Sequence, residues 1–415
     1  MRFRNPSGYN PLACTLNPTM KNSRNRKKSA YPSVFYITHR DNLLSILQHG
    51  VLSHEKAASL SSAVVYDEQI VARRRDKKTP DGNNLWRFAN FYFQPRNPML
   101  YRVFRCERQD VAVLHLRGAL VEKARYVSIG NAASSASRFM DVKEGIAEIK
   151  SDKMQKILRA EIWRGEDEQK RLIMSELLVP GDASPEYIDT VYVPNENIAR
   201  KTTMQLSGRA HVVPEPNLFF ESSRTFKLRG TKISIVDGDM FFSNMQTLTI
   251  SVNTVGVMGK GLASRARENF PQVYAAYRQF CDDGRLTTKS PCLYKEEYSY
   301  DSHMAYDPDT LTQKPNDERW FLLFATKEHW RNPSRLEYLE GGLQWLLENA
   351  GKEKIKSLAM PALGCGLGGL PWHRVGPVMC RYLHKLNIDC EIYLPRETAK
   401  RIPGAQLSAK FLLMD

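Results

Sequence analysis

Two glycine-rich stretches and one lysine are the residues in the second half of the chain whose types and spacing could do chemistry. Gly364, Gly366 and Gly369 follow the order G-x-G-x-x-G, and residues 253–261 read "NTVGVMGKG". Glycine permits positive φ and a close backbone approach, so such loops can wrap a diphosphate with N–H groups. An amine such as that of Lys327, desolvated in a pocket, can attack a sugar carbon. The alternative for this lysine is a solvated surface position.

The G-x-G-x-x-G order is also the dinucleotide-binding fingerprint, and Asp389 lies where that fingerprint places an acidic residue, about 20 residues farther on. The fingerprint, however, belongs to a first strand–turn–helix with further βαβ units after it. Here the sequence predicts only one helix and one strand after the loop. It therefore favours a diphosphate-binding loop without hydride chemistry over a dehydrogenase.

Four predicted strands in this half end in polar or glycine residues. "KISIV" leads to Asp239, "LTISV" to Asn253, "FLLFAT" to Lys327 and "LAMPAL" to Gly364. Helical patterns alternate with them, including one helix expected over residues 260–284, which indicates an α/β sheet covered on both faces. Because ligands bind beyond the carboxyl ends of the strands in open α/β sheets, we expect these residues to face one crevice.

The first half carries most of the positive charge. Residues 1–210 hold 34 Lys and Arg against 22 Asp and Glu, whereas the remainder holds 26 against 23. Residues 1–30 contain seven basic and no acidic residues, which predicts a flexible basic arm. Residues 70–101 interleave basic and aromatic side chains, which suits a single nucleic-acid strand, because cations follow phosphates while rings stack on bases. The alternatives are a solvated basic surface and, for the rings, a core strand.

The length and composition set further limits. A chain of 415 residues predicts two domains. No apolar run is long enough to span a membrane, and the N-terminus lacks the apolar core of a secretion signal. Seven scattered cysteines without a C-x-x-C pair argue against a disulfide framework or zinc ribbon and favour a cytoplasmic location. We expect no metal. The predicted organisation is an arm (1–30), an α+β domain (31–205), a linker (206–228) and an α/β domain (229–415).

Four segments of the second domain resemble the macrodomain of DarG, an antitoxin that removes ADP-ribose from DNA bases. They are "GDM", "NTVGVMGKGLA", "TKEHWRNPSRLEYLEGGL" and "PALGCGLGGL", in order within residues 230–396. The resemblance implies an α/β/α three-layer fold. It also implies that Asp239 hydrogen-bonds the adenine amino group, Asn253 orients the distal ribose, and Lys327 attacks or polarises its anomeric carbon. The implied ADP-ribose-binding residues are Asp239, Met240, Asn253, Thr254, Gly256, Val257, Met258, Gly259, Gly261, Thr326, Lys327, Gly364, Cys365, Gly366, Leu367, Gly368 and Gly369.

Residues 31–205 resemble DarT, a DNA-targeting ADP-ribosyltransferase, through "ITHRDNL", "FYFQPRNPMLY" and "SELLVP". The resemblance implies an ADP-ribosyltransferase fold that splits NAD and transfers ADP-ribose to a ring nitrogen of thymidine in single-stranded DNA. Glu176 would be the transferase glutamate, whose carboxylate stabilises positive charge as the glycosidic bond opens. Arg74 would be the catalytic arginine that positions the base, with Arg73 and Arg75 as further candidates for that role.

The transferase family carries an H-x-x-H pattern near its NAD site, and here Tyr36 stands in place of the first histidine, while His39 matches the second. Two outcomes are open: Tyr36 serves instead of the histidine, or the transferase is slowed. The implied NAD-binding residues are Tyr36, Thr38, His39, Asn42 and Arg74. The residues expected to contact DNA are Arg73, Arg75, Arg96, Met99, Tyr101 and Arg138, together with the loop 130–139.

The two resemblances together predict a toxin and an antitoxin in a single chain. One domain would write ADP-ribose onto single-stranded DNA with NAD as co-substrate, and the macrodomain would erase it from ADP-ribosylated DNA, with possible contact between the fused halves. By resemblance, the biological role would be phage defence. Two alternatives remain open. One is an ADP-ribose-binding macrodomain on a catalytically weak nucleic-acid anchor, which Tyr36 favours. The other is a transferase that acts on RNA or protein.

Overall fold

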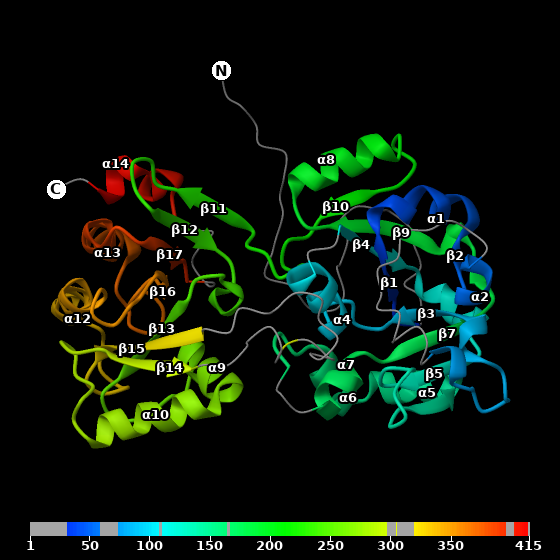
Figure 1. Ribbon diagram of the computed structural model, residues 1–415, viewed down its shortest axis with the longest axis horizontal. Coiled ribbons are helices and arrows are strands. Elements are labelled where there is room, and N and C mark those ends of the chain that lie inside the picture. The colour runs from blue at the N-terminus through cyan, green and yellow to red at the C-terminus, as the bar shows by residue number, and fades with distance from the viewer. Residues whose placement is uncertain are drawn as a thin grey trace. The chain divides into compact units, whose positions relative to one another are not determined.

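The computed structural model separates the chain into two compact units, which are described one at a time (Figure 1). The structure describes residues 31–58, 74–107, 110–163, 167–296, 304, 319–395 and 402–413. The predicted basic arm and Arg73 lie outside these residues. Among the described helices, none has the length and apolar character that crossing a membrane requires.

The first half of the chain builds an eight-stranded sheet with the order β10-β9-β4-β1-β3-β7-β5-β6. Neighbouring strands β1–β3, β3–β7, β7–β5 and β5–β6 are antiparallel. A small second sheet pairs β2 with β8. The strands are β1 (Val34–His39), β2 (Val51–Leu52), β3 (Phe88–Tyr92), β4 (Val111–Leu116), β5 (Tyr126–Ile129), β6 (Arg138–Asp141), β7 (Glu176–Pro180), β8 (Asp182–Ala183), β9 (Ile188–Val193) and β10 (Val212–Pro214).

Short helices accompany this sheet, and Figure 1 shows α5, α6 and α7 close to β5 and β7. The helix predicted before Gly50 is present, and it ends there because Gly50 has φ +82°. A side chain at that position would meet the carbonyl oxygen of Ala183 at 2.1 Å. The α+β class is confirmed. The helices are α1 (Leu43–His49), α2 (His54–Ala57), α4 (Pro98–Tyr101), α5 (Val142–Lys150), α6 (Asp152–Leu158), α7 (Asp167–Ile173) and α8 (Glu196–Gln205).

The second half forms a seven-stranded sheet with the order β11-β12-β17-β16-β13-β15-β14. Its five central strands are parallel, and the two edge strands β11 and β14 are antiparallel to their neighbours. The strands are β11 (Arg224–Lys227), β12 (Ile233–Asp237), β13 (Thr247–Asn253), β14 (Cys292–Glu296), β15 (Arg319–Lys327), β16 (Ser357–Pro361) and β17 (Asp389–Tyr393).

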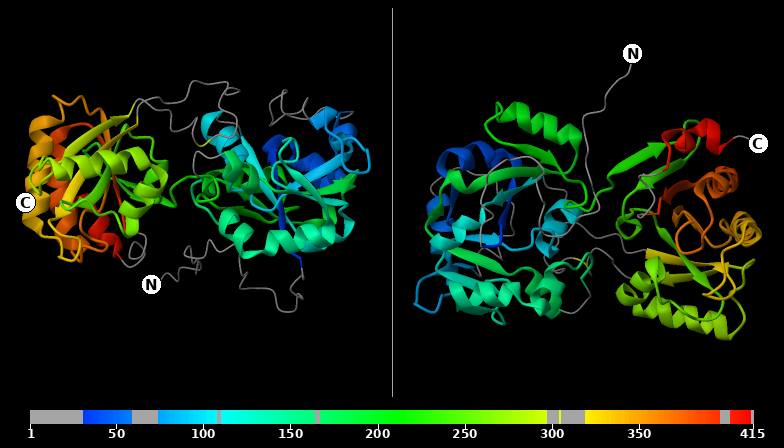
Figure 2. Two further views of the ribbon diagram at one scale, coloured as in Figure 1. Left: turned by 90° about the horizontal axis from the view of Figure 1, so that it is seen from below. Right: turned by 180° about the vertical axis from the view of Figure 1, so that it is seen from behind.

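Helices cover both faces of this second sheet, as the views in Figures 1 and 2 agree. One face carries α12 and α13, which contact each other and the sheet, and the other carries α9 and α10. The three-layer α/β/α prediction is therefore confirmed. The helices are α9 (Gly261–Asn269), α10 (Pro271–Asp282), α12 (Leu336–Asn349), α13 (Trp372–Leu386) and α14 (Ala409–Leu412).

The single helix expected over residues 260–284 is wrong, because the structure has two helices there. The helix α9 ends at Asn269, and α10 begins at Pro271. Between them Phe270 has φ −135° and ψ +71°, since a residue that precedes proline avoids the helical conformation. Within the proposed linker, residues 206–228, β10 joins the first sheet and β11 pairs with β12. The domain boundaries 31–205 and 229–415 stay a proposal.

The strand β15 shows how a buried, apolar strand can end in a polar side chain at the edge of the sheet. Eight of its nine residues, from Arg319 to Thr326, are buried, and only Lys327 at its end is partly exposed. A parallel strand covered on both faces reads as a nearly continuous apolar run, and "WFLLFA" fits that description. The core thus ends where the lysine leaves the sheet.

Two candidate active sites

The register of three neighbouring strands assembles the first site. Phe35 on β1 pairs with Tyr92 on β3, and Tyr92 pairs with Glu176 on β7. Tyr36, which stands where the transferase family has a histidine, therefore lies one strand away from Tyr92 and two strands away from Glu176. Residues far apart in the sequence are brought together by the antiparallel pairing.

The Glu176 carboxylate is fully buried and accepts hydrogen bonds from three other residues. One guanidinium nitrogen of Arg74, Nη2, lies 3.1 Å from each carboxylate oxygen. Asn90 Nδ2 donates to Oε2 at 2.7 Å, and the backbone N–H of Ala132 donates to Oε1 at 2.9 Å. The exposed fraction is 0% for Glu176 and 7% for Arg74. The predicted catalytic pair is therefore a buried ion pair held in one orientation.

The charges around this pair favour the ionised form of the arginine. Burial alone would lower the pKa of Arg74, but the negative charge of Glu176 and the hydrogen bond to it raise that pKa above its ordinary value. The phenol of Tyr92 is buried beside the pair, and burial, followed by the charge of Glu176, raises its pKa. The nearby Tyr36 also raises the pKa of Arg74, by a smaller amount than Glu176 does. The neutral phenol of Tyr92 therefore adjoins the ion pair.

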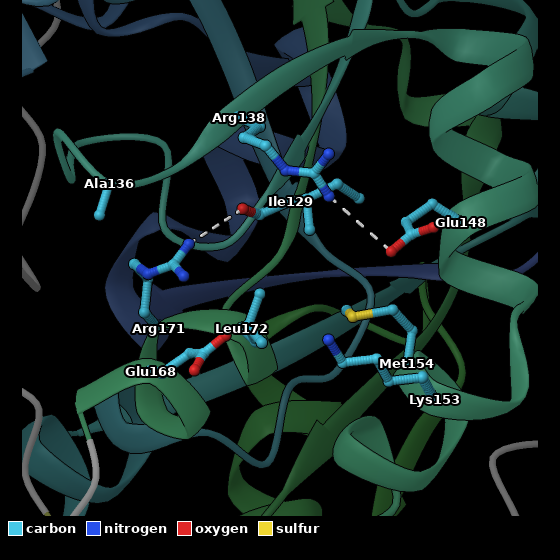
Figure 3. Close-up of a pocket in the computed structure, with 9 residues that line it drawn as sticks. All are labelled: Ile129, Ala136, Arg138, Glu148, Lys153, Met154, Glu168, Arg171 and Leu172. Atoms are coloured by element: carbon cyan, nitrogen blue, oxygen red, sulfur yellow. Dashed lines mark hydrogen bonds and ion pairs between the residues drawn. The ribbon is translucent and has the colours of Figure 1, made fainter.

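The loop between β5 and β6 supports Glu176 on one side and lines a pocket on the other (Figure 3). The backbone N–H of Gly130 donates to Ser175 Oγ at 2.8 Å, which ties this loop to the residue before Glu176. The pocket has a volume of about 190 Å³ and is lined by Ile129, Ala136, Arg138, Glu148, Lys153, Met154, Glu168, Arg171 and Leu172. It therefore mixes three cationic with two anionic side chains.

The other residues predicted to bind NAD follow Tyr36 directly. Thr38 is buried at the end of β1, and its Oγ1 accepts from Asn42 Nδ2 at 3.3 Å. His39 Nδ1 accepts from the backbone N–H of Asp41 at 3.3 Å and so caps the turn before α1. The structure thus gives Thr38, His39 and Asn42 a shared local role at the strand end. Their proposed role in NAD binding stays a prediction.

The residues predicted to contact DNA differ in exposure. Arg75 is exposed, with its guanidinium 4.9 Å from the ring centre of Trp86. Arg138 is exposed at the rim of the pocket in Figure 3. Arg96 and Met99 are half-buried. Tyr101 is 1% exposed and packs edge-to-face on Phe220. In this structure, therefore, arginines and not the Tyr101 ring reach the surface.

Most aromatic side chains of residues 86–93 belong to the core, as expected if this segment is a core strand. Phe88, Phe91, Tyr92 and Phe93 are all buried. Trp86 differs, because it is partly exposed and its ring stacks on His54 with 4.8 Å between ring centres.

Asp239 opens the second site, at the end of β12. Its Oδ1 accepts from the backbone N–H of Phe241 at 3.2 Å. Arg265, on α9, donates from Nη2 to Oδ2 at 2.6 Å and from Nη1 to Oδ1 at 3.3 Å. The guanidinium also lies 4.9 Å from the ring centre of Phe241. The carboxylate predicted to bind adenine is thus oriented by an arginine that the sequence reading missed.

The side chain of Asn253 forms hydrogen bonds with the backbone of the first glycine loop. Its Nδ2 donates to the carbonyl oxygen of Val257 at 2.6 Å, and its Oδ1 accepts from the backbone N–H of Val255 at 3.0 Å. Tyr277, which is fully buried on α10, donates to the same Oδ1 at 2.9 Å. Burial raises the pKa of the Tyr277 phenol, so it stays a donor. Both ends of the Asn253 amide therefore hold the loop.

The second glycine loop meets Lys327. The lysine Nζ donates to the carbonyl oxygen of Leu367 at 3.2 Å. Gly364 has φ +70°, and a Cβ there would lie 3.0 Å from that of Ser334, whereas a Cβ on Gly366 would meet nothing within 4 Å. The loop is thus packed against the protein at Gly364 and open at Gly366. Such a loop can turn its N–H groups towards a phosphate.

The environment of Lys327 suits a reactive amine. Desolvation by partial burial lowers its pKa from the ordinary value. The neighbouring Thr326 is buried, and its Oγ1 lies 3.0 Å from Ser251 Oγ. Thr254 donates from both its backbone N–H and its hydroxyl to the carbonyl oxygen of Glu328, at 3.1 and 2.9 Å. The first glycine loop therefore lies beside the end of the strand that carries the lysine.

The remaining predicted ADP-ribose-binding residues surround these loops. Met240 and Met258 are buried. Val257 and Leu367 are exposed. Cys365 is half-buried, and burial raises the pKa of its thiol to about 12, so it stays protonated near neutral pH.

Four groups of the two sites were missed by the sequence reading: Asn90, the N–H of Ala132, Arg265 and Tyr277. None of them was named as a site residue, although Asn90 lies within residues 70–101 and Ala132 lies in the loop 130–139. Asn90 lies in the middle of an apolar strand, and a polar residue in a core run is the one signal that could have identified it.

Comparisons with known proteins match both halves of the chain. Residues 35–220 match the family model described as ssDNA thymidine ADP-ribosyltransferase, DarT, and residues 319–379 match the Macro domain model. The DNA ADP-ribosyl transferase-DNA ADP-ribosyl glycohydrolase fusion protein of Thermosipho africanus (strain H17ap60334) is 47% identical over 389 residues. These are 92% of this chain and 98% of that protein.

A solved structure, Thermosipho africanus DarTG in complex with ADP-ribose, is similar along the whole chain. Its TM-score is 0.84 at 46% identity, and the match covers 92% of this chain and 100% of that one. The DNA ADP-ribosyl glycohydrolase of Thermus aquaticus (strain ATCC BAA-2747 / Y51MC23) is 35% identical over 169 residues, 40% of this chain and 42% of that protein. The chain therefore belongs to the family of fused DNA ADP-ribosyl transferases and DNA ADP-ribosyl glycohydrolases, the DarT–DarG fusion that the two resemblances predict.

Proposed function

We propose that the chain writes ADP-ribose from NAD onto thymine bases of single-stranded DNA and erases it again. The observation that carries this proposal is the match along 92% of the chain to a protein described as a fusion of both activities. The description of the model matched by residues 35–220 supports a single strand and thymidine as the target. NAD enters as a co-substrate.

Glu176 and Arg74 are the residues proposed to carry the transfer. The bond between nicotinamide and ribose breaks with positive charge on the sugar, and a buried carboxylate next to that sugar stabilises the charge. Hydrogen bonds from Asn90 and Ala132 fix the carboxylate, so it need not reorganise during the reaction. Arg74, which stays protonated, would orient the thymine base and stabilise the negative charge on it after its ring nitrogen gives up a proton to water. That nitrogen then attacks the sugar carbon that nicotinamide leaves. Tyr36 adjoins this pair.

Lys327 is the residue proposed to carry the erasure. The pKa of its amine is lowered by burial, so a larger fraction of the amine is neutral than for an exposed lysine. A neutral amine can attack the anomeric carbon of the distal ribose. The base then leaves with the bonding electron pair and takes up the proton that the amine gives up, and water finally displaces the lysine to release ADP-ribose. Glycine loops around residues 256–261 and 364–369 would hold the diphosphate. Asp239 would accept a hydrogen bond from the adenine amino group.

The test is transfer of label from NAD to DNA. The Lys327→Ala chain is incubated with NAD labelled in the adenylate and with oligonucleotides that contain or lack thymidine. The lysine is replaced because an active eraser would remove the product. We expect label on thymidine-containing single strands, and we expect unsubstituted chain added afterwards to release it.

The matched control is Glu176→Gln in the Lys327→Ala chain, which keeps the size of the side chain but removes its charge and replaces one accepting oxygen by an N–H donor. Label that reaches DNA independently of Glu176 would contradict the proposed transfer. Label that reaches RNA or protein in preference to DNA would change the substrate. Label that unsubstituted chain does not release would limit the macrodomain to binding.

A further inference from the structure

Four exposed apolar side chains lie on the loops that carry the proposed ADP-ribose-binding residues. Val255 and Val257 are 47% and 40% exposed, Trp330 is 47% exposed and Leu367 is 70% exposed. We call these four residues the apolar rim. Elsewhere in the described part of the chain, the large hydrophobic side chains with comparable exposure are Tyr31, Leu44 and Met204. An apolar cluster of this kind, bordered by polar groups, marks an interaction surface.

Hydrogen bonds join the loops that carry the apolar rim. Thr254, next to the rim valines, bonds twice to the carbonyl oxygen of Glu328, two residues before the rim tryptophan. The backbone N–H of Ser334 donates to the carbonyl oxygen of Gly368 at 3.0 Å, which joins the tryptophan loop to the second glycine loop. In that glycine loop, the carbonyl oxygen of Leu367 also accepts a hydrogen bond from the Lys327 amine. The loops that carry the rim therefore lie side by side next to Lys327.

The chemistry of the apolar rim fits a nucleic-acid strand. The guanidinium of Arg331 lies 4.5 Å from the ring centre of Trp330, and the ring of His329 lies 5.3 Å from it. Lys260 and Arg335, on the adjoining loops, are exposed cations. A partly exposed indole with cations beside it can stack on a base while the cations lie near phosphates.

We propose that the apolar rim is the docking surface for the DNA strand that carries the ADP-ribose, with Trp330 stacked on a base of that strand. This inference rests on the proposed erasing function. The diphosphate needs the N–H groups inside the crevice, whereas the base joined to the distal ribose leaves the crevice next to Lys327. It meets the rim at that point. Because every base has a π-face, such a platform accepts strands of varied sequence.

The test compares free ADP-ribose with an ADP-ribosylated strand. Glu176→Gln chain is used throughout, so that no new ADP-ribose is written. The substrate is a synthetic single-stranded oligonucleotide with ADP-ribose on one thymine. Removing one stacking ring costs about 1–3 kcal/mol, equivalent to roughly 5- to 150-fold. We expect Trp330→Ala to lower kcat/KM for release by about tenfold or more and to leave the affinity for free ADP-ribose, measured by calorimetry, within about twofold.

Two matched variants separate stacking from general loss of apolar surface. Trp330→Phe keeps a ring and should retain most of the activity, whereas Met204→Ala removes an 80% exposed side chain elsewhere and should change nothing. An unchanged kcat/KM for Trp330→Ala, or an equal loss of affinity for free ADP-ribose, would overturn the inference. If the Glu176→Gln chain releases nothing while Trp330 is intact, the erasing function itself is wrong and the inference falls with it.

Discussion

The two sites handle charged substrates by opposite means. In the transferase site the key carboxylate is fully buried and paired with an arginine that is 7% exposed. In the macrodomain site the key amine is partly exposed and bonds to a single backbone carbonyl, on a loop rich in glycine. One site is built from side-chain charges inside a core, and the other from backbone at a surface.

This difference predicts how each site is coupled to folding. A buried ion pair stabilises the fold only while both partners are present, since the loss of one leaves an unpaired buried charge. Replacing a partly exposed lysine at a strand end leaves no buried charge unpaired. Catalysis and stability should therefore be inseparable in the transferase site and separable in the macrodomain site.

The largest effect is expected for Arg74→Ala. It leaves Glu176 buried without its cation, which costs about 3–5 kcal/mol. Native-state hydrogen exchange at the amides of β3 and β7 in the whole chain measures this as a lower free energy of opening. Lys327→Ala, by contrast, should change the opening free energy of the second sheet by less than about 0.5 kcal/mol.

The control for this prediction is the double variant Arg74→Met with Glu176→Leu. Replacing both charges by apolar groups should restore most of the lost protection, because no charge is left unpaired. Protection in Arg74→Ala equal to that of the unsubstituted chain would show that water reaches Glu176, and it would remove the contrast between the sites.

The transferase site should also give the fold a dependence on pH. Burial, and then the nearby charge of Arg74, lower the pKa of His54 from 6.5 to about 3. The unfolded chain therefore binds a proton between pH 6.5 and 3 that the folded chain does not, so stability is lost as pH falls through this window. The contribution is at most about 1.4 kcal/mol per pH unit.

His54→Gln should make the free energy of unfolding depend less on pH in this window. The measurement is denaturant unfolding at several pH values, followed by tryptophan fluorescence. His373, an exposed histidine on α13, offers the matched control, and His373→Gln should leave the profile unchanged. A slope that persists in His54→Gln would assign the pH dependence to other groups.

The macrodomain was the easier of the two to predict from sequence, for a physical reason. Its parallel strands are buried on both faces, so each reads as an apolar run, and each ends in the polar or glycine residue that the crevice needs. Lys327 and Gly364 could be placed at one sheet edge on that basis. The edge strands β11 and β14 escaped prediction, because short antiparallel edges have no such signature.

The transferase site was harder, because its contacts are made across the sheet. Arg74 and Glu176 are 102 residues apart, and no local pattern links either of them to Asn90. Likewise, Arg265 lies on the exposed-looking stretch "SRARE", and its pairing with Asp239 depends on how α9 packs on β13. Motifs located the groups proposed to contact the ligands, but the residues that orient them came only from the structure.

Backbone conformation should matter more than charge in the macrodomain, and Gly364→Ala tests this. An L-residue at φ +70° costs about 1–2 kcal/mol, and its Cβ would also press on Ser334. We expect the affinity for ADP-ribose, measured by calorimetry, to fall by roughly tenfold as the loop shifts. Gly351→Ala, in a turn where a Cβ meets nothing within 4 Å, is the control and should leave the affinity unchanged.

The smallest effect is expected for Arg265→Ala, which leaves Asp239 in place but removes the two hydrogen bonds that the arginine donates to it. A partly exposed ion pair contributes about 1 kcal/mol or less, so the affinity for ADP-ribose should fall by about fivefold or less, through a less ordered carboxylate. Arg267→Ala, an exposed arginine on the same helix, should have no effect. A hundredfold or larger loss of affinity for ADP-ribose would show that this site, like the transferase site, depends on a charge pair. The two sites would then differ only in how deeply that pair is buried.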